Sequence, residues 1–391
     1  MHFFNHKIYF KKPKHTDFLI WDYINSRRLK SVIPNSYSIS IIGTRPLGIY
    51  LHPKIILLSL ILLKDFKLGV CSNNLVGFLK DSLKQLQCIH IKACLVAINP
   101  KAVITGIDNC SRFAWLSKNC NSFPFIAIQN GLRLAYDSED GHPYHVQHLF
   151  CFGQKEINDF PKMGYEVENF YPVGSLLASR KFNMTMQQEP SKNDLLIVSC
   201  WRGNIGFNKD VQDSMKTMNI MDNLLAKYLK KSNLKATIML RSERNGIDWF
   251  MPEIGYSEED YYKLIYDNLV NIVEPNFKER NIYPAMQYSN LIVASFPTTC
   301  LIEAFSIGKK VLYTRFGDCD KKYYSDIPKE VIFSSNSNNE DDFFNAIDEL
   351  LLIKKETYIS KYQQLMAYYN SFPKNYSTTE EIKIKIKQII K

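Results

Sequence analysis

The 391-residue sequence lacks the cysteine patterns of a zinc site or a disulfide framework. Its nine cysteines are scattered singly, without a CxxC pair or a Cys/His spacing that suits zinc. Because reducing compartments keep such cysteines unpaired, this usage predicts reduced thiols in a cytosolic protein.

Long hydrophobic runs and the pattern of a signal peptide are also missing from this sequence. Residues 1–7 have no apolar core followed by small residues, so we expect no signal peptide. The longest apolar run, residues 55–63, is too short to cross a bilayer, and we expect it to be a buried helix or strand.

Two nucleotide-site motifs are absent as well. The sequence has no GxGxxG and no GxxxxGK[ST], which excludes the dinucleotide fingerprint and the P-loop. It has no convincing Asp-x-Asp metal motif either.

Positive charge is in excess, with a formal net charge of +10. Such an excess favours anionic partners such as nucleotides, nucleic acid or a bilayer surface. The basic residues are dispersed and no motif for reading nucleic acid is present, so we expect no nucleic-acid partner. Residues 11–14, Arg27 with Arg28, and the lysine-rich tail from Lys383 are candidates for contact with anionic lipid, and a solvated face is the alternative.

Strand and helix patterns alternate along both halves of the chain. Apolar runs predict strands at residues 17–22, 38–42, 102–108, 124–128 and 148–152, and again at 195–199, 236–240, 291–294 and 331–333. Helical periodicity fills the intervals, which predicts an α/β fold of two Rossmann-like, doubly wound domains facing a cleft. A polar, proline-containing linker at 187–194 divides a first Rossmann-like domain (1–190) from a second (191–372), followed by a terminal helix (373–391) that is expected to pack back on the first domain.

Residues 291–313 form the most informative strand-loop-helix-strand unit. Ser295, Thr298 and Thr299 lie in the small polar loop before the helix, where free N–H groups and the helix dipole favour an anion. Glu303, about one turn into the helix, can reach a ribose hydroxyl pair. Alternatively, the threonines are only caps and Glu303 is a solvated carboxylate.

Two further loops in the second half offer groups for a phosphorylated ligand. Arg202 and Gly203 follow one predicted strand, and Arg241 follows the next. Guanidinium forks and a glycine that admits close backbone approach suit phosphate, and surface salt bridges are the alternative role for the arginines.

In the first half, Asp108 ends a predicted strand. A carboxylate at this edge can act as general base on an acceptor hydroxyl or as a nucleophile that forms a glycosyl intermediate. An N-cap of the following helix is the alternative.

The turn after the next predicted strand carries further polar groups. Gln129, Asn130, Gly131 and Arg133 suit sugar hydroxyls or an acidic group. His142 follows and is assigned to acceptor contact, while His145 and His148 complete a cluster that only superficially resembles a metal site. We expect no metal.

Several of these segments resemble the GT-B glycosyltransferases of bacterial surface polysaccharide synthesis. The resemblance is closest to surface carbohydrate biosynthesis proteins and more distant to capsule Kdo transferases and polyol-phosphate polymerases, and it covers about residues 93–316 in order. Its motifs are residues 104–109, 126–133, 149–153 and 172–175. The histidine signatures of the distant relatives are not matched, since Gln129-Asn130-Gly131 stands where a His-Gly turn is expected.

The resemblance implies an acceptor domain followed by a nucleotide-sugar domain, with Glu303 on the ribose, Thr298 and Thr299 on the phosphates, and Asp108 at the reacting centre. We therefore expect a metal-independent transferase without a cofactor, which moves a sugar from a nucleotide-sugar to a lipid-linked or oligosaccharide acceptor. Its expected location is cytoplasmic, peripheral to the inner face of the membrane. The alternatives are a transferase of CMP-Kdo or another CMP-ulosonate, and a non-catalytic scaffold or sugar-binding component.

Overall fold

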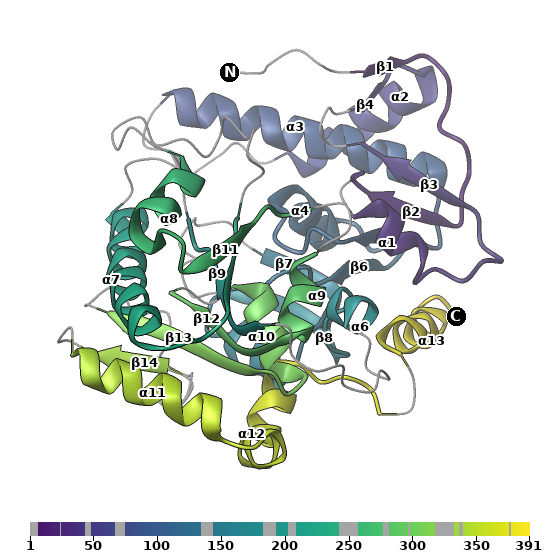
Figure 1. The fold of residues 1–391 in the computed structure, drawn as a ribbon. Coiled ribbons are helices and arrows are strands. Elements are labelled where there is room, and N and C mark those ends of the chain that lie inside the picture. The colour runs from purple at the N-terminus through teal and green to yellow at the C-terminus, as the bar shows by residue number, and fades with distance from the viewer. Residues whose placement is uncertain are drawn as a thin grey trace. The chain divides into compact units, whose positions relative to one another are not determined.

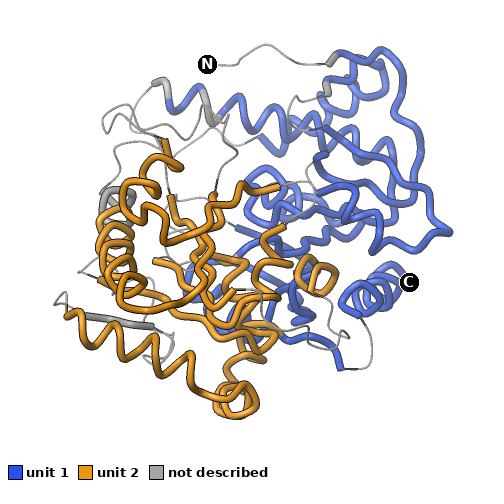
Figure 2. The backbone as a smooth tube through the Cα atoms, viewed as in Figure 1, with its two compact units in different colours: residues 1–131, 137–176, 371–391 blue, residues 132–136, 177–370 orange. Residues whose placement is uncertain are grey.

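A computed structural model describes residues 7–23, 25–43, 48–66, 75–133, 144–182, 193–201, 209–241, 257–276, 281–295, 298–316, 332–335, 339–374 and 377–391. The chain divides into two compact units. Unit 1 comprises residues 1–131, 137–176 and 371–391, and unit 2 comprises 132–136 and 177–370 (Figure 2). The chain thus leaves unit 1 after Leu176, earlier than the expected boundary at 190, because Val173 and Leu176 pack into the core of unit 1.

Unit 1 is built on a six-stranded sheet in which every pairing is parallel. The strands lie in the order β3-β2-β5-β6-β7-β8 (Figure 1). Their bounds are β2 Phe18–Trp21, β3 Ile39–Ile42, β5 Ala102–Thr105, β6 Phe125–Ile128, β7 Tyr144–Cys151 and β8 Tyr165–Pro172.

Both faces of this sheet are buried, which explains the apolar runs without polar alternation. Alternate strand residues face two separate core clusters. One face packs on helices α3 (Leu75–Ile98) and α4 (Ser111–Asn119), and the other on α1 (Ser26–Lys30) and α13 (Thr378–Ile389). The first cluster includes Leu19, Trp21, Val103, Phe125, Leu95 and Phe113, and the second includes Phe18, Ile20, Ile104, Ile126, Leu29 and Ile382.

The segment from residue 371 onward belongs to unit 1. Ser371 N–H donates to Phe152 O at 2.8 Å, and Thr378 Oγ1 donates to Val173 O at 2.9 Å. Gly174 has a φ of +77°, and a Cβ there would lie 2.6 Å from the ring of Phe372. Glycine is therefore required where the tail crosses.

Unit 2 repeats the architecture with a second six-stranded, all-parallel sheet in the order β11-β10-β9-β12-β13-β14. Its strands are β9 Asn193–Val198, β10 Ala236–Met239, β11 Val270–Val273, β12 Ser289–Ala294, β13 Lys310–Phe316 and β14 Ile332–Ser335. The helices are α6 Ala178–Lys181, α7 Lys209–Lys231, α8 Glu258–Tyr266, α9 Ile282–Gln287, α10 Thr299–Ser306, α11 Glu340–Leu352 and α12 Lys355–Tyr369. Together the two sheets confirm the predicted α/β class with doubly wound parallel sheets.

A small outlying layer completes unit 1. Strands β1 (Lys7–Tyr9) and β4 (Gly48–Tyr50) pair in parallel, and α2 (Pro53–Ile61) with the 3₁₀ turn η1 (Leu62–Asp65) packs on α3. The expectation that residues 55–63 are buried is wrong. They form a helix and turn in which only Ile55 is buried, because one side of α2 packs on α3 while its other side is exposed. Among the described helices, none is both long and apolar enough to cross a membrane.

Candidate functional site

The strand order of each sheet reverses at one point. In unit 2 the reversal lies between β9 and β12, and in unit 1 between β2 and β5. Open α/β sheets bind ligands outside the carboxyl ends of the strands at such switch points. The predicted loops after β9, β12 and β5 therefore occupy the positions where the topology favours a ligand.

Helix α10 begins directly after the carboxyl end of β12. Thr298 is its N-cap, and the Thr298 hydroxyl accepts from Leu301 N–H at 3.3 Å. Thr299 is the first helical residue, and its hydroxyl accepts from Leu132 N–H, also in unit 2, at 2.9 Å. Thr298 thus caps the helix and Thr299 is bonded to a second segment, and the phosphate contacts of both threonines stay predictions.

Ser295 lies at the end of β12, before the same helix. Its side chain is 4% exposed, and within the described part of the chain its Oγ has no hydrogen-bond partner. A buried hydroxyl without a hydrogen-bond partner destabilises the fold unless another molecule supplies that partner. A ligand oxygen at the N-terminus of α10 would supply that partner.

Glu303 lies in the first turns of α10 and is 1% exposed. Its Oε2 accepts from the hydroxyl of Tyr283 on α9 at 2.7 Å. The alternative of a solvated carboxylate is therefore wrong, since the helix turns this residue into the protein. The ribose contact stays a prediction.

Arg241 follows β10 and reaches across to the loop after β9. Its Nη1 donates to Trp201 O at 2.7 Å, and its own N–H donates to Glu258 Oε1 at 2.8 Å. Arg241 is half-buried, and its phosphate contact stays a prediction. Arg202 and Gly203 lie outside the described residues.

Glu258, the first residue of α8, was missed by the sequence reasoning. It is buried, and Oε1 also accepts a short hydrogen bond from the Ser199 hydroxyl, which in turn accepts from Tyr262 OH at 2.8 Å. One carboxylate thus joins the ends of β9 and β10. The capping box of Ser257 and Asp260 marks the start of the helix, but no sequence pattern shows that Glu258 points inward.

In unit 1, Asp108 is buried beyond the end of β5. Its Oδ1 accepts from Asn130 N–H at 3.2 Å, which joins the loops after β5 and β6. The N-cap alternative is wrong, because α4 begins at Ser111 with Cys110 as its N-cap. The structure therefore brings the predicted catalytic carboxylate together with the predicted acceptor loop.

Gln129 is buried and bonded within that loop. Its Nε2 donates to Gly131 O at 2.9 Å and to Glu156 Oε1 at 3.1 Å, and its Oε1 accepts from Phe152 N–H at 2.9 Å. These bonds fix the shape of the turn that presents Asn130. Arg133 is half-buried, and its acceptor contact and that of Gln129 stay predictions.

Glu156 is a second carboxylate that the sequence did not reveal. It is fully enclosed, and its Oε2 accepts from Gly153 N–H at 2.9 Å. Burial raises the pKa of Glu156 to about 7, against the opposing effect of its hydrogen bonds. Through its bonds with Gln129 and Gly153, Glu156 holds the predicted acceptor loop from the buried side.

Asp22 ends β2, on the other side of the switch point of unit 1. It is buried in a left-handed backbone conformation with a φ of 74°. Nearby Asn25 donates to Gly106 O at 3.2 Å, which ties this loop to the one that leads to Asp108. The only signal in the sequence is an aspartate at the end of an apolar run.

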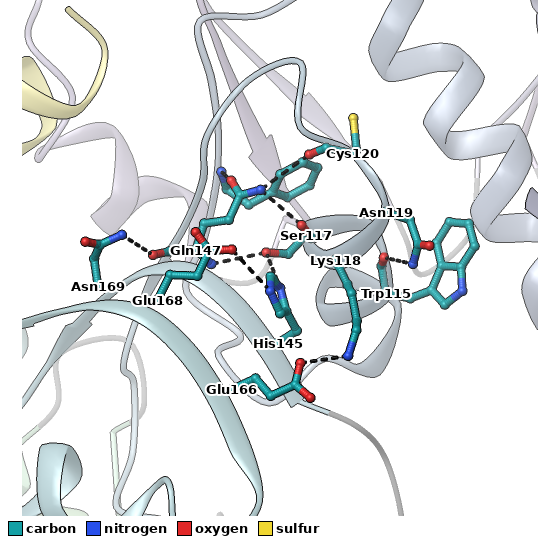
Figure 3. A network of polar contacts seen from close by, with 11 residues as sticks. Trp115, Ser117, Lys118, Asn119, Cys120, His145, Gln147, Glu166, Glu168 and Asn169 are labelled. Carbon is teal, nitrogen blue, oxygen red and sulfur yellow. Dashed lines mark hydrogen bonds and ion pairs between the residues drawn. The ribbon is translucent and has the colours of Figure 1, made fainter.

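The described histidines of the predicted cluster serve separate partners. His145 Nδ1 lies 3.2 Å from Ser117 Oγ and its Nε2 lies 3.3 Å from Glu168 Oε1 (Figure 3), whereas His148 Nδ1 lies 3.1 Å from Tyr171 OH. His142 lies outside the described residues. His145 and His148 therefore do not converge on one ligand.

Two doubly wound, all-parallel units with polar loops at their switch points define the GT-B fold. No family model matches the sequence, and no curated protein matches it. Solved structures do match, at identities that establish the fold alone.

A glycosyltransferase from Rickettsia africae is 13% identical, with a TM-score of 0.51 over 97% of this chain and 99% of its own. The Arabidopsis thaliana protein UGT89C1, solved with UDP, is 10% identical, with a TM-score of 0.52 over 97% and 100%. A protein from Listeria monocytogenes described as a UDP-N-acetylglucosamine 2-epimerase is 11% identical, with a TM-score of 0.51 over 97% and 96%.

Proposed function

We propose that this chain is a glycosyltransferase that takes its sugar from a nucleotide-sugar donor. The observation that carries the proposal is the buried, unpartnered Ser295 hydroxyl before helix α10, at the switch point of a GT-B fold. A helix N-terminus next to a hydroxyl that has no hydrogen-bond partner suits the oxygens of a diphosphate. The fold neighbours support this choice, since one is a glycosyltransferase and another was solved with UDP.

Unit 2 would hold the donor. The N-terminus of α10 would bind the phosphates with Ser295, Thr298 and Thr299, and Glu303 would hold the ribose. Arg202, Gly203 and Arg241 would line the same donor site. When the bond between the sugar and the phosphate breaks, the electron pair leaves with the nucleotide. The helix dipole and the arginines would stabilise that charge without a metal ion or cofactor.

Unit 1 would supply the acceptor side. Asp108 would accept the proton of the acceptor hydroxyl as that oxygen bonds to the sugar, or would itself attack the sugar carbon as a nucleophile. Its bond from Asn130 N–H fixes its orientation. Gln129, Asn130, Gly131 and His142 would contact the acceptor, together with Arg133 from the segment 132–136, which belongs to unit 2. For that acceptor we propose a lipid-linked or oligosaccharide chain of a surface polysaccharide pathway.

A nucleotide panel tests the donor. Isothermal titration with UDP, CMP, GDP and ADP is expected to give micromolar binding of one base, and Ser295→Ala is expected to weaken it. Preference for CMP would identify the CMP-ulosonate transferase. Absence of binding to every nucleotide would overturn the proposal in favour of a scaffold.

A second assay separates transfer from other nucleotide-sugar chemistry. The Listeria neighbour shows that this fold also occurs in a protein described as an epimerase. Incubation with the preferred nucleotide-sugar, with and without lipid-linked saccharide, is expected to release nucleotide only when the acceptor is present. Release without acceptor, accompanied by a changed sugar, would contradict transfer. The anomer of the product distinguishes the two roles of Asp108.

A further inference from the structure

Exposed large hydrophobic side chains gather in one part of unit 1. In the described part of the chain, all of them lie between Ile8 and Val96 except Leu264, Leu352 and Ile384. Helix α2, turn η1 and the first half of α3 carry eight of these fourteen side chains, and α2 packs on the C-terminal part of α3 (Figure 1). The members on these elements form what we call the apolar face: Ile56, Leu57, Leu60, Ile61, Leu63, Leu79, Leu83 and Leu86.

Helix α2 is apolar on two sides, of which one packs on α3 and the other is exposed. Ile55, Leu58 and Leu62 pack against Ala93 and Cys94 of α3. Its outer side has Leu57 and Leu60, each 59% exposed, where a surface helix normally carries polar residues. At nine residues it is ~13 Å long, too short to cross a bilayer and long enough to lie along its surface.

Helix α3 extends the same surface. Leu79, Leu83 and Leu86 recur at intervals of four and three residues, and His90 and Cys94 continue that row toward the end of the helix. At Cys94 the row is covered by α2, whereas the three leucines are exposed. The apolar row of α3 is therefore covered by α2 near Cys94 and is exposed from Leu79 to Leu86.

The rim of the apolar face is positively charged. Lys54 and Lys64 lie exposed at the two ends of the apolar stretch, and Lys84 lies exposed on α3. Between residues 48 and 98 the sequence has only two acids, Asp65 and Asp81, and Asp65 is paired with Lys92 at 2.7 Å. Lysines around exposed leucines match a surface that is apolar inside and anionic at its boundary.

We propose that the apolar face docks on an anionic bilayer surface. Leucines of α2 and α3 enter the boundary between headgroups and acyl chains, and Lys54, Lys64 and Lys84 meet lipid phosphates. Self-association is disfavoured, because a two-fold contact between copies would bring the two lysine rims together. The face also differs from residues 11–14, Arg27–Arg28 and the tail, where basic residues alone suggested lipid contact.

Vesicle flotation of the full chain tests the proposal without nucleotide or acceptor, so it stands or falls separately from the proposed function. The wild type is expected to float with vesicles of equal phosphatidylcholine and phosphatidylglycerol. Leu57→Asp with Leu60→Asp is expected to reduce the partition coefficient about tenfold or more, because two apolar side chains lose their burial in lipid. Leu264→Asp with Leu352→Asp, at positions 73% and 82% exposed, is the matched control and should stay within about twofold.

Two further experiments test the contribution of the lysines and whether copies of the chain associate. Lys54→Gln with Lys64→Gln is expected to weaken binding to the mixed vesicles about fivefold per lysine, and not to phosphatidylcholine alone. If the aspartate pair fails to fold, judged by circular dichroism, Leu57→Ser with Leu60→Ser replaces it. Equal flotation of wild type and variant would overturn the proposal. So would a wild-type dimer in light scattering that the variant makes monomeric, combined with no flotation.

Discussion

The carboxyl edges of the two sheets have the same topology but differ in the hydrogen bonding of their buried polar side chains. In unit 1, the buried polar side chains of the loops after β5 and β6 have partners from the protein: Asp108 is bonded to Asn130, and Gln129 to Gly131, Phe152 and Glu156. Trp21 Nε1, at the end of β2, has none among the described residues, but its ring packs in the core against Phe113. In unit 2, Glu258 joins the ends of β9 and β10, but Ser295 before α10 has no partner among the described residues.

The difference suggests how the two units divide the work. An edge whose buried polar groups are satisfied keeps its shape without a ligand, whereas an unpartnered hydroxyl is satisfied only when one binds. We infer that unit 1 presents a preformed catalytic edge and that unit 2 completes its edge with the donor.

The largest expected effect tests the edge of unit 1. Asp108→Asn keeps an acceptor for Asn130 N–H and removes the charge, so we expect the transfer rate to fall about 10²–10⁴-fold. The dissociation constant of the nucleotide should change less than twofold. Steady-state kinetics and titration measure the two quantities, and full activity in the variant would remove Asp108 from the reacting centre.

A second prediction concerns pH and the buried Glu156. The pKa of Glu156 is raised from 4.5 to about 7, so between these values the folded protein holds a proton that the unfolded chain has lost. Stability therefore falls as pH rises through this window, by up to about 3 kcal/mol in the free energy of unfolding.

Glu156→Gln should flatten that dependence when urea unfolding is compared at pH 4.5 and pH 8. Asp222 is the counterpart in unit 2, where burial also raises its pKa to about 7 while Tyr261 and Tyr266 donate to it. Identical pH dependence in the wild type and Glu156→Gln would contradict the assigned burial effect.

A smaller effect tests the edge of unit 2. Ser295→Ala is expected to weaken nucleotide binding about tenfold, since one hydrogen bond to a charged group contributes about 1.5 kcal/mol. Thr314→Val is the matched control: its buried Oγ1 also has no partner within the described chain, but it lies within β13 rather than before a helix. Equal affinity in wild type and both variants would show that the Ser295 hydroxyl does not meet the ligand.

The smallest effect is expected outside both edges. Lys118 and Glu166 pair at 2.7 Å with side chains 50% and 58% exposed (Figure 3). Solvent screens such pairs, so Lys118→Ala should change the free energy of unfolding by less than about 0.5 kcal/mol and leave transfer unchanged. If Lys118→Ala lowered the transfer rate as much as Asp108→Asn, the effect of a substitution would not depend on its place at a carboxyl edge.

The sequence predicted the sheets better than the ends and exposure of their elements. Runs such as residues 102–105 and 125–128 are apolar throughout, and parallel strands buried on both faces require that. Strand β7 begins at Tyr144 rather than 148. His145 and Gln147 interrupt the apolar pattern, but Tyr144, His145 and Val146 still pair with β8. The edge strands β8 and β11 were missed. The short helix α9 was missed as well, since Pro284 lies within it.

The site was only partly predictable for a related reason. Loop position followed from the strand-helix alternation, and so Asp108 and Ser295 could be named. Glu156, Glu258 and Asp22 could not, because what distinguishes them is burial, which depends on elements distant in sequence. The apolar residues 55–63 failed in the opposite way, since composition cannot show that one side of a helix has no neighbour.

The tail in unit 1 has a consequence for biosynthesis. Ile382 and Ile386 of α13 belong to the same core as Phe18 and Ile20, with the whole of unit 2 between them in the chain. On the ribosome, the first sheet must therefore wait with one face incompletely covered until residues 378–389 have been translated. The nascent protein thus exposes an apolar surface longest in the part that is made first.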